Sequence, residues 1–398
     1  MTLATRDFHS LFAFARATSK WAWSKDRKLT EVQPQQPARG FDPASLESQG
    51  ISIEENSANY WPNSADASQA PGKAEFTFAP INSIFDTGST SYEITNLGNI
   101  GSRSLTAAVR VANGATETLW AIFETGGTAT ETRLGLRDTT QNNWGGQFQY
   151  NWSTKTSSLT APNQSDPGGT APQFIGPITL IPEGQGPNGG EVFLIGMVGS
   201  VLSGNNALMY IYPTGSGQNT DSVYMHHAQW EVKGHITSPI ITSGAAAVRG
   251  LDLCPINAMS PWFNQNQGTF LVEFRDVKNG VESALLTFSD GTVTNRFSFR
   301  KNANNGAVRL ISVADGNASI PNFQTSSESL AASYDDTSVI LHDGNTADER
   351  TVNAVPVGSK LYIGTRFDGQ GYFANGFISK VKYIPRKLTA SEMASWLQ

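Results

Sequence analysis

The 398-residue chain has a single cysteine, Cys254, and this scarcity excludes two kinds of site. One cysteine can form neither an intramolecular disulfide nor a CxxC metal site. Charged residues are also scarce, at 16% of the chain against about 25% in an ordinary soluble protein, and the net charge is −6. The chain therefore lacks the broad basic field that attracts nucleic acid, and we expect no nucleic-acid partner.

Long apolar runs are missing as well. The longest nearly unbroken run, residues 192–202, has 11 residues and contains two glycines, whereas a membrane helix needs about 20. The apolar stretch at residues 11–15 ends at Arg16 and is too short for the hydrophobic region of a secretory signal. We therefore expect a soluble protein without membrane insertion and without the usual export signal.

Residue patterns for catalysis and metal binding are also lacking. His226 and His227 are adjacent, so on a strand they point to opposite faces and cannot share a metal. The sequence has no HExxH spacing and no GxSxG elbow, and residues 343–348 (DGNTAD) lack the EF-hand spacing, which favours a polar turn over a Ca²⁺ site. We expect no cofactor, no metal and no enzymatic activity. A glycan depolymerase with paired carboxylates stays open as a less favoured alternative.

The sequence is rich in short alternating segments bounded by Gly, Asn, Ser or Pro. Residues 296–300 (RFSFR) show the pattern, because Phe297 and Phe299 share one face and the polar residues share the other. Similar strand-length segments lie at residues 105–111, 118–124, 205–212, 222–232, 269–274, 307–313, 338–342, 360–364 and 376–384. Many short strands with Gly-rich turns predict an all-β fold of two antiparallel jelly-roll or β-sandwich domains.

The first fifty residues differ from the rest. They carry seven positive charges, and residues 33–43 (QPQQPARGFDP) are too rich in proline for a helix or a central strand. We predict an extended N-terminal arm over residues 1–50 that docks on another chain, with a poorly ordered terminus as the alternative. The two sandwich domains then occupy residues 51–252 and 253–398.

One helix is predicted, at the end of the chain. Residues 389–392 (TASE) form a capping box, in which Thr389 and Glu392 satisfy each other's backbone amides. Leu388 and Met393 stand at the positions of the hydrophobic staple, and Met393, Trp396 and Leu397 give the helix one apolar face. We expect this helix to close the end of the second sandwich.

Three groups of motifs resemble known proteins. Residues 14–19 (FARATS), 37–43 (PARGFDP) and 49–59 (QGISIEENSAN) resemble the opening of a family of bacteriophage fibre and spike proteins. Residues 228–231 (AQWE), 237–240 (TSPI) and 247–249 (AVR) followed by Asp252 resemble the end of that family's carbohydrate-binding jelly roll. Residues 361–364 (LYIG) and 375–389 (NGFISKVKYIPRKLT) resemble the end of a concanavalin-A-like, laminin-G-like lectin sandwich.

This resemblance implies a structural protein of a virion, a head or tail fibre or spike, that is assembled in the host cytoplasm. Its expected partners are other virion proteins, reached through the N-terminal arm, two further copies in a homotrimer, and polysaccharide on the host-cell surface. Trp230 stands where the family has leucine, and Gly250 and Leu251 replace two alanines, so ligand specificity does not carry over. The alternative is a purely architectural capsid decoration or connector that binds no glycan.

Two segments are candidates for glycan contact. Residues 141–153 (QNNWGGQFQYNWS) embed Asn143, Trp144, Tyr150 and Trp152 among amides, and a sugar needs a flat aromatic platform with a few amide partners. Tyr150 and Trp152 share strand parity and would form one stripe; the alternative is that these aromatics face the core or a trimer interface. The second segment is the turn at residues 368–375, whose candidate residues are Asp368, Tyr372 and Asn375. Its alternative is a plain Gly-rich hairpin.

Overall fold

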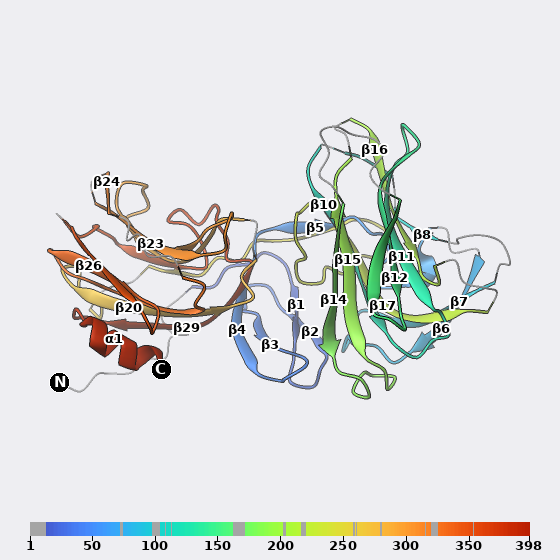
Figure 1. Cartoon of the computed structure of the whole chain (residues 1–398), viewed down its shortest axis with the longest axis horizontal. Helices are drawn as coiled ribbons and strands as arrows, with labels where there is room; N and C mark the ends of the chain where they lie inside the picture. The colour runs from blue at the N-terminus through green and yellow to red at the C-terminus, as the bar shows by residue number, and fades with distance from the viewer. Residues whose placement is uncertain are drawn as a thin grey trace.

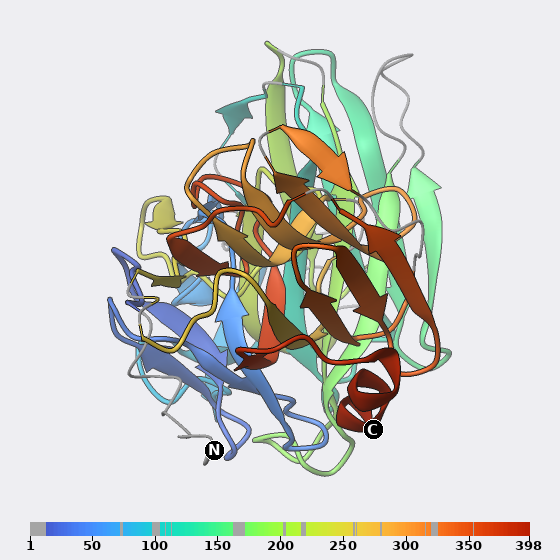
Figure 2. The same ribbon diagram turned by 90° about the vertical axis from the view of Figure 1, so that its left-hand side faces the viewer.

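The computed structural model describes residues 13–398, apart from residues 72–74, 98–103, 108, 113, 162–171, 202–203, 216–219, 258, 260, 279–280, 315, 320–324 and 353. The fold is all-β, as predicted, and its strands form two lobes that lie side by side along the long axis (Figure 1). Figure 2 looks along that axis, with the C-terminal lobe in front of the other. Within the described residues no helix is both long and apolar enough to cross a membrane.

The first sandwich packs two antiparallel sheets face to face. One sheet, which we call the covered sheet, has the order β14-β15-β10-β17-β7-β6; the other, the outer sheet, has the order β13-β12-β11-β16-β8, with β9 also paired to β16. The strands of the covered sheet are β6 (Phe76–Ile81), β7 (Ser91–Asn96), β10 (Glu117–Glu124), β14 (Gln173–Ile181), β15 (Val192–Gly199) and β17 (Ser222–Glu231). Those of the outer sheet are β8 (Leu105–Thr106), β9 (Arg110–Val111), β11 (Glu131–Asp138), β12 (Asn143–Asn151), β13 (Thr156–Ala161) and β16 (Asn206–Tyr212).

The strand predicted over residues 105–111 is in fact two short strands. β8 pairs with one end of β16 and β9 with the other. Val109, which precedes β9, and Val111 of β9 are both exposed.

The second sandwich has sheets of order β19-β28-β21-β22-β23-β24 and β27-β26-β25-β20-β29-β4-β3. The first sheet consists of β19 (Pro255–Ile256), β21 (Ser283–Ser289), β22 (Arg296–Lys301), β23 (Val308–Ala314), β24 (Asn317–Ser319) and β28 (Lys360–Ile363). The second consists of β3 (Arg39–Phe41), β4 (Ser48–Ile53), β20 (Gly268–Arg275), β25 (Ser329–Tyr334), β26 (Ser338–His342), β27 (Ala347–Thr351) and β29 (Gly376–Ile384). Phe297 and Phe299 of β22 face the core, as their alternation predicts.

The N-terminal segment differs from the prediction of an extended arm. Residues 13–50 fold back on their own chain: β1 (Lys20–Trp23) and β2 (Leu29–Val32) form a hairpin, and β4 pairs with β29 at the edge of the second sandwich. Trp21 and Leu29 pack on Trp120, Ile122 and Leu194 of the covered sheet. The prediction fails because two of the seven positive charges, Arg16 and Lys20, are buried inside the protein. Trp21 and Leu29 of the same segment also add apolar side chains to a buried core. Residues 1–12 lie outside the described residues.

A buried ionic cluster joins this segment to both sandwiches. Asp252 accepts from Arg16 (Nη1–Oδ1, 3.0 Å) and from Lys20 (Nζ–Oδ2, 2.7 Å), and Lys20 also reaches Glu54 (Nζ–Oε2, 2.8 Å), which pairs with Arg249. All five side chains are buried. Burial would raise the pKa of Glu54, but Arg249 and Lys20 hold it well below its ordinary value. Four of the five, Arg16, Glu54, Arg249 and Asp252, belong to the motifs that resemble fibre proteins, so those motifs have a structural role here.

The remaining elements complete the junction and the C-terminus. β5 (Ser57–Asn59) pairs with β18 (Ala247–Arg249), and the 3₁₀ turn η2 (Ala67–Gln69) follows. The helix α1 (Ala390–Leu397) confirms the predicted capping box between Thr389 and Glu392. Leu388 and Met393 are buried against Ala331 and Ile340, whose strand neighbours Leu330 and Leu341 face the core. The helix therefore covers the outer face of β25 and β26 rather than the end of the second sandwich.

Candidate functional site

Two of the aromatic residues predicted as a sugar platform, Tyr150 and Trp152, pack into the core of the first sandwich. Tyr150 is 2% exposed, and Trp152 packs edge-on against Phe193 with ring centroids 5.1 Å apart. Trp152 also donates from Nε1 to Thr132 Oγ1 over 3.0 Å. Burial raises the pKa of Tyr150 to about 12. The structure therefore supports the alternative, in which these two rings face the core.

For the other two candidates of this segment, Asn143 and Trp144, the structure gives only the strand pairing. Asn143 pairs with Asp138 and Trp144 pairs with Arg137 in the β11–β12 ladder. Their side chains lie outside the described residues.

The opposite parity of the same strand lines the other face of the outer sheet. Phe148 and Tyr150 face the core, so Gln147 and Gln149 project from the opposite face of β12, where Gln147 is buried and Gln149 is half-buried. Register across β12, β11 and β16 aligns two rows: Gln149, Arg133 and Tyr212 in one, and Gln147, Gly135 and Tyr210 in the next. We call this surface, together with Arg137 of β11, the outer-sheet face. The β1–β2 hairpin packs on the covered sheet and not on this face, yet Tyr212 is only 8% exposed here and Tyr210 is half-buried.

The two tyrosines form the aromatic part of the outer-sheet face. The rings of Tyr210 and Tyr212 lie nearly parallel, with an interplanar angle of 15° and centroids 6.0 Å apart. They stand side by side because residues two apart on a strand project from the same face. Gly135 has no side chain, so the surface is low between Gln147 and Tyr210.

Polar groups around the tyrosines are held in place. Glu131 accepts from Arg133 (Nη2–Oε1, 2.8 Å) and also from the amide of Gln149, so one carboxylate orients both donors. Thr160 donates to Gln147 Oε1 over 2.9 Å. Burial and the nearby Tyr210 raise the pKa of Tyr212, while Arg137 and Arg133 oppose that rise. These contacts fix the orientations of Arg133, Gln147 and Gln149.

This arrangement suits a carbohydrate. Sugars present apolar C–H faces and a rim of hydroxyl groups, so they bind aromatic rings flanked by amides and guanidinium groups. The outer-sheet face supplies all three on one sheet. The sequence signal for this face was the alternation of residue types along the strands. Met209 and Ile211 alternate with Tyr210 and Tyr212, and Phe148 and Tyr150 alternate with glutamines.

The second predicted segment, residues 368–375, has a different character. Asp368 pairs with Arg366 and accepts from the Gln370 amide over 2.9 Å. Asn375 is buried, and its Oδ1 accepts from the Glu55 amide over 3.1 Å, so it braces the junction between the sandwiches. Tyr372 has guanidinium groups over its ring, and its positive φ of 51° marks an irregular turn rather than a plain hairpin.

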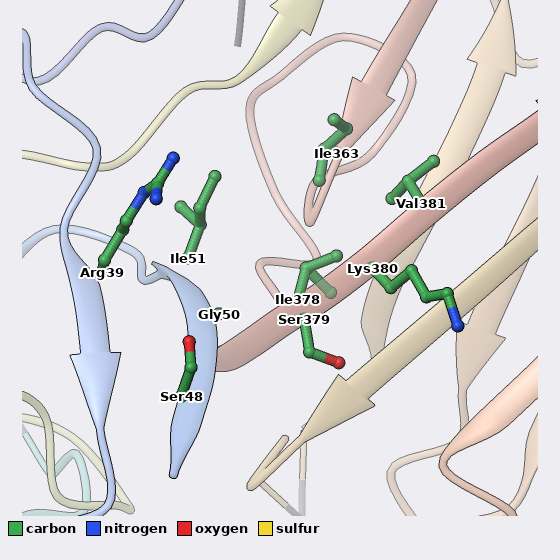
Figure 3. A pocket seen from close by; sticks show the side chains of 9 residues that line it. All are labelled: Arg39, Ser48, Gly50, Ile51, Ile363, Ile378, Ser379, Lys380 and Val381. Atoms are coloured by element: carbon green, nitrogen blue, oxygen red, sulfur yellow. The ribbon is translucent and has the colours of Figure 1, made fainter. Parts of the chain in front are cut away.

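A groove of about 290 Å³ opens beside β29 (Figure 3). β4 pairs with β29 only as far as Ile378, where Gly50 has a φ of 103° and a Cβ would lie 2.3 Å from the Ile378 carbonyl oxygen. Aliphatic side chains, including Ile51 and Ile363, lie on one side of the β29 ribbon, and Ser379 and Lys380 point to the other. Nothing in the described residues indicates an occupant for this groove.

One buried trio combines a hydroxyl, an imidazole and a carboxylate. His226 Nδ1 lies 2.7 Å from Ser91 Oγ, and His226 Nε2 lies 3.0 Å from Glu124 Oε2. A nucleophile must reach its substrate, yet Ser91 and Glu124 are completely buried. Burial lowers the pKa of His226, which favours the neutral imidazole. This trio acts as a hydrogen-bonded brace within the covered sheet, and no group of three or more His, Cys, Asp or Glu in the described residues could hold a metal.

Comparisons with known proteins add little to the fold. The chain is similar to the mouse laminin alpha1 chain, domains LG4-5, with 10% sequence identity and a TM-score of 0.24, over 74% of this chain and 94% of that chain. Models of known families and curated protein sequences give no match. A TM-score this low assigns no family, so the all-β architecture rests on the strands and sheets described above.

Proposed function

We propose that this protein is a structural component of a virion, a head or tail fibre or spike, that binds polysaccharide on the host-cell surface. The motif resemblance of residues 14–59 and 228–252 supports the virion role and the homotrimer that such proteins form. The observation that carries glycan binding is the parallel pair Tyr210 and Tyr212 beside Arg133 and Gln149 on the outer-sheet face.

The experiment has two steps. A microarray of bacterial surface polysaccharides identifies a bound glycan, and titration calorimetry then measures its affinity for the wild type and for Tyr210→Ser. Loss of one ring contact worth about 1.4 kcal/mol weakens binding tenfold, so we expect at least that loss. Tyr224→Ser is the matched control, because Tyr224 is a half-buried tyrosine on β17 of the covered sheet. Equal affinity of Tyr210→Ser and wild type would overturn the assignment of the site.

A purely architectural role is the second candidate. Leu159 and Ile178 are 46% and 45% exposed on β13 and β14, which are edge strands of the two sheets of the first sandwich. Exposed apolar residues on strand edges favour contact with another protein chain. This role gains support if the protein binds no polysaccharide on the array yet is incorporated into particles, and if Ile178→Asp prevents that incorporation.

A further inference from the structure

Four arginines gather at one end of the second sandwich. Arg296 and Arg300 lie on β22, Arg309 lies on β23 opposite Arg300, and Arg366 lies in the segment that follows β28. We call these four residues the arginine cluster. It lies in the second sandwich, separate from the outer-sheet face, so the inference does not depend on the function proposed above.

Two aromatic rings alternate with the guanidinium groups. Arg296 and Arg366 lie over the ring of Phe367, at 5.5 and 5.0 Å from its centroid. Arg366 and Arg300 lie over the ring of Tyr372, at 5.4 and 4.6 Å. Cation–π contacts of this kind hold the planar guanidinium groups in fixed orientations. Tyr372 therefore presents arginines to a ligand rather than a bare ring.

The cluster carries more positive than negative charge. Glu282 is shared by Arg300 and Arg309, each 3.2 Å from its Oε1, and Asp368 is occupied by Arg366. Arg296 donates to the carbonyl oxygen of Val293 over 3.0 Å and forms no ion pair with a described carboxylate. Four guanidinium groups thus face two carboxylates.

Several donors in the cluster have no hydrogen-bond partner among the described residues. The Nε atoms of Arg296, Arg300 and Arg309 are buried without a hydrogen bond. Arg300 is only 5% exposed, whereas the side chains of Arg309 and Arg366 are 29% and 31% exposed. Burial, and the like charges of Arg300 and Arg366, lower the pKa of Arg296. Uncompensated charge in a partly buried position is costly. Because the Nε atoms themselves are buried, an oxyanion from outside would relieve that cost through the half-buried side chains of Arg296, Arg309 and Arg366.

We propose that the arginine cluster binds the carboxylate or sulfate groups of an acidic polysaccharide. Guanidinium groups pair with both kinds of oxyanion through two parallel hydrogen bonds, and the surplus of two positive charges matches a ligand with repeated negative charge. We favour a polysaccharide over a nucleic acid because the whole chain, with a net charge of −6, lacks the broad basic field that a long phosphate backbone needs, and the cluster is confined to one part of the second sandwich.

The test is calorimetric titration of the full chain with four probes: alginate oligosaccharides, dextran sulfate oligosaccharides, uncharged dextran and single-stranded DNA. We expect alginate, dextran sulfate or both to bind, with an affinity that falls as NaCl is raised, and we expect dextran not to bind. Binding of alginate identifies carboxylate as the recognised oxyanion, and binding of dextran sulfate identifies sulfate. Failure of both acidic probes, equal binding of dextran, or equally tight binding of DNA would overturn the proposal.

The variants locate the site. Arg296→Gln removes a charge without leaving a carboxylate unpaired, and we expect it to weaken acidic-oligosaccharide binding about ten- to hundredfold, as loss of a charged hydrogen bond does. Arg386→Gln is the matched control, since it makes the same charge change at a 54% exposed side chain beside α1. Tyr210→Ser should leave this binding unchanged, which separates failure here from failure of the proposed function. Unaltered affinity in Arg296→Gln, with normal thermal unfolding, would contradict the assignment.

Discussion

The buried cluster around Asp252 gives the sharpest prediction about stability. Asp252→Asn keeps the size of the side chain but removes the charge that faces Arg16 and Lys20 at 3.0 and 2.7 Å. Lys20 keeps its second partner, Glu54, but within the described residues the Arg16 side chain keeps only backbone carbonyl oxygens as acceptors. Breaking a buried ion pair from one side typically costs about 3–5 kcal/mol, because the other charge stays buried without compensation.

The assay is equilibrium unfolding in urea, followed by circular dichroism. With a slope of about 3 kcal/mol per molar urea, a loss of 3–5 kcal/mol lowers the midpoint by about 1 M or more. Arg275→Gln is the control, because Arg275 and Glu47 form an ion pair whose side chains are 46% and 68% exposed, and such a pair contributes about 0–1 kcal/mol. The double variant Asp252→Asn/Lys20→Met should recover part of the loss. The reasoning fails if Asp252→Asn shifts the midpoint no more than Arg275→Gln does.

Three further predictions follow from burial. Tyr150→Ala should lower the free energy of unfolding by about 3–5 kcal/mol and leave glycan affinity unchanged; weaker binding by the folded variant would place the ring in the site after all. Burial lowers the pKa of His227 from 6.5 to about 4, so between these pH values the unfolded chain binds a proton that the folded chain does not bind. The free energy of unfolding should therefore fall by about 1.4 kcal/mol per pH unit as the pH is lowered from 6.5 to 4. Equal urea midpoints at pH 7.5 and pH 5 would contradict this prediction. Deletion of residues 1–45 removes Trp21 and Leu29 from the covered sheet, so the truncated chain should aggregate or bind a hydrophobic dye, whereas a soluble chain with a native spectrum would argue against their role in the core.

The fold class and the C-terminal helix could be predicted because their signals are local. Alternation over five or six residues defines a strand, and the capping box at Thr389 lies within four residues. The fate of the N-terminal segment could not be predicted in this way. Arg16 and Lys20 read as surface charges in the sequence, and only their partner Asp252, more than 230 residues away, makes them interior.

The candidate glycan site illustrates the same limit. The parity of Tyr150 and Trp152 was predicted correctly, since both rings pack together in the core, but parity alone does not say which face is buried. The glutamines next to Tyr150 indicate which face is buried, because a half-buried strand turns its polar side chains away from the core. The pairing of Arg133 with Tyr212 depends on strand register between segments almost eighty residues apart, and no local pattern encodes it.

The most direct test of the central claim is a crystal structure of the protein with the oligosaccharide that it binds most tightly on the array. The account predicts a sugar ring against Tyr210 or Tyr212, with hydroxyl groups bonded to Arg133 and Gln149. A well-ordered neutral oligosaccharide bound anywhere else, with the outer-sheet face left to solvent, would contradict it.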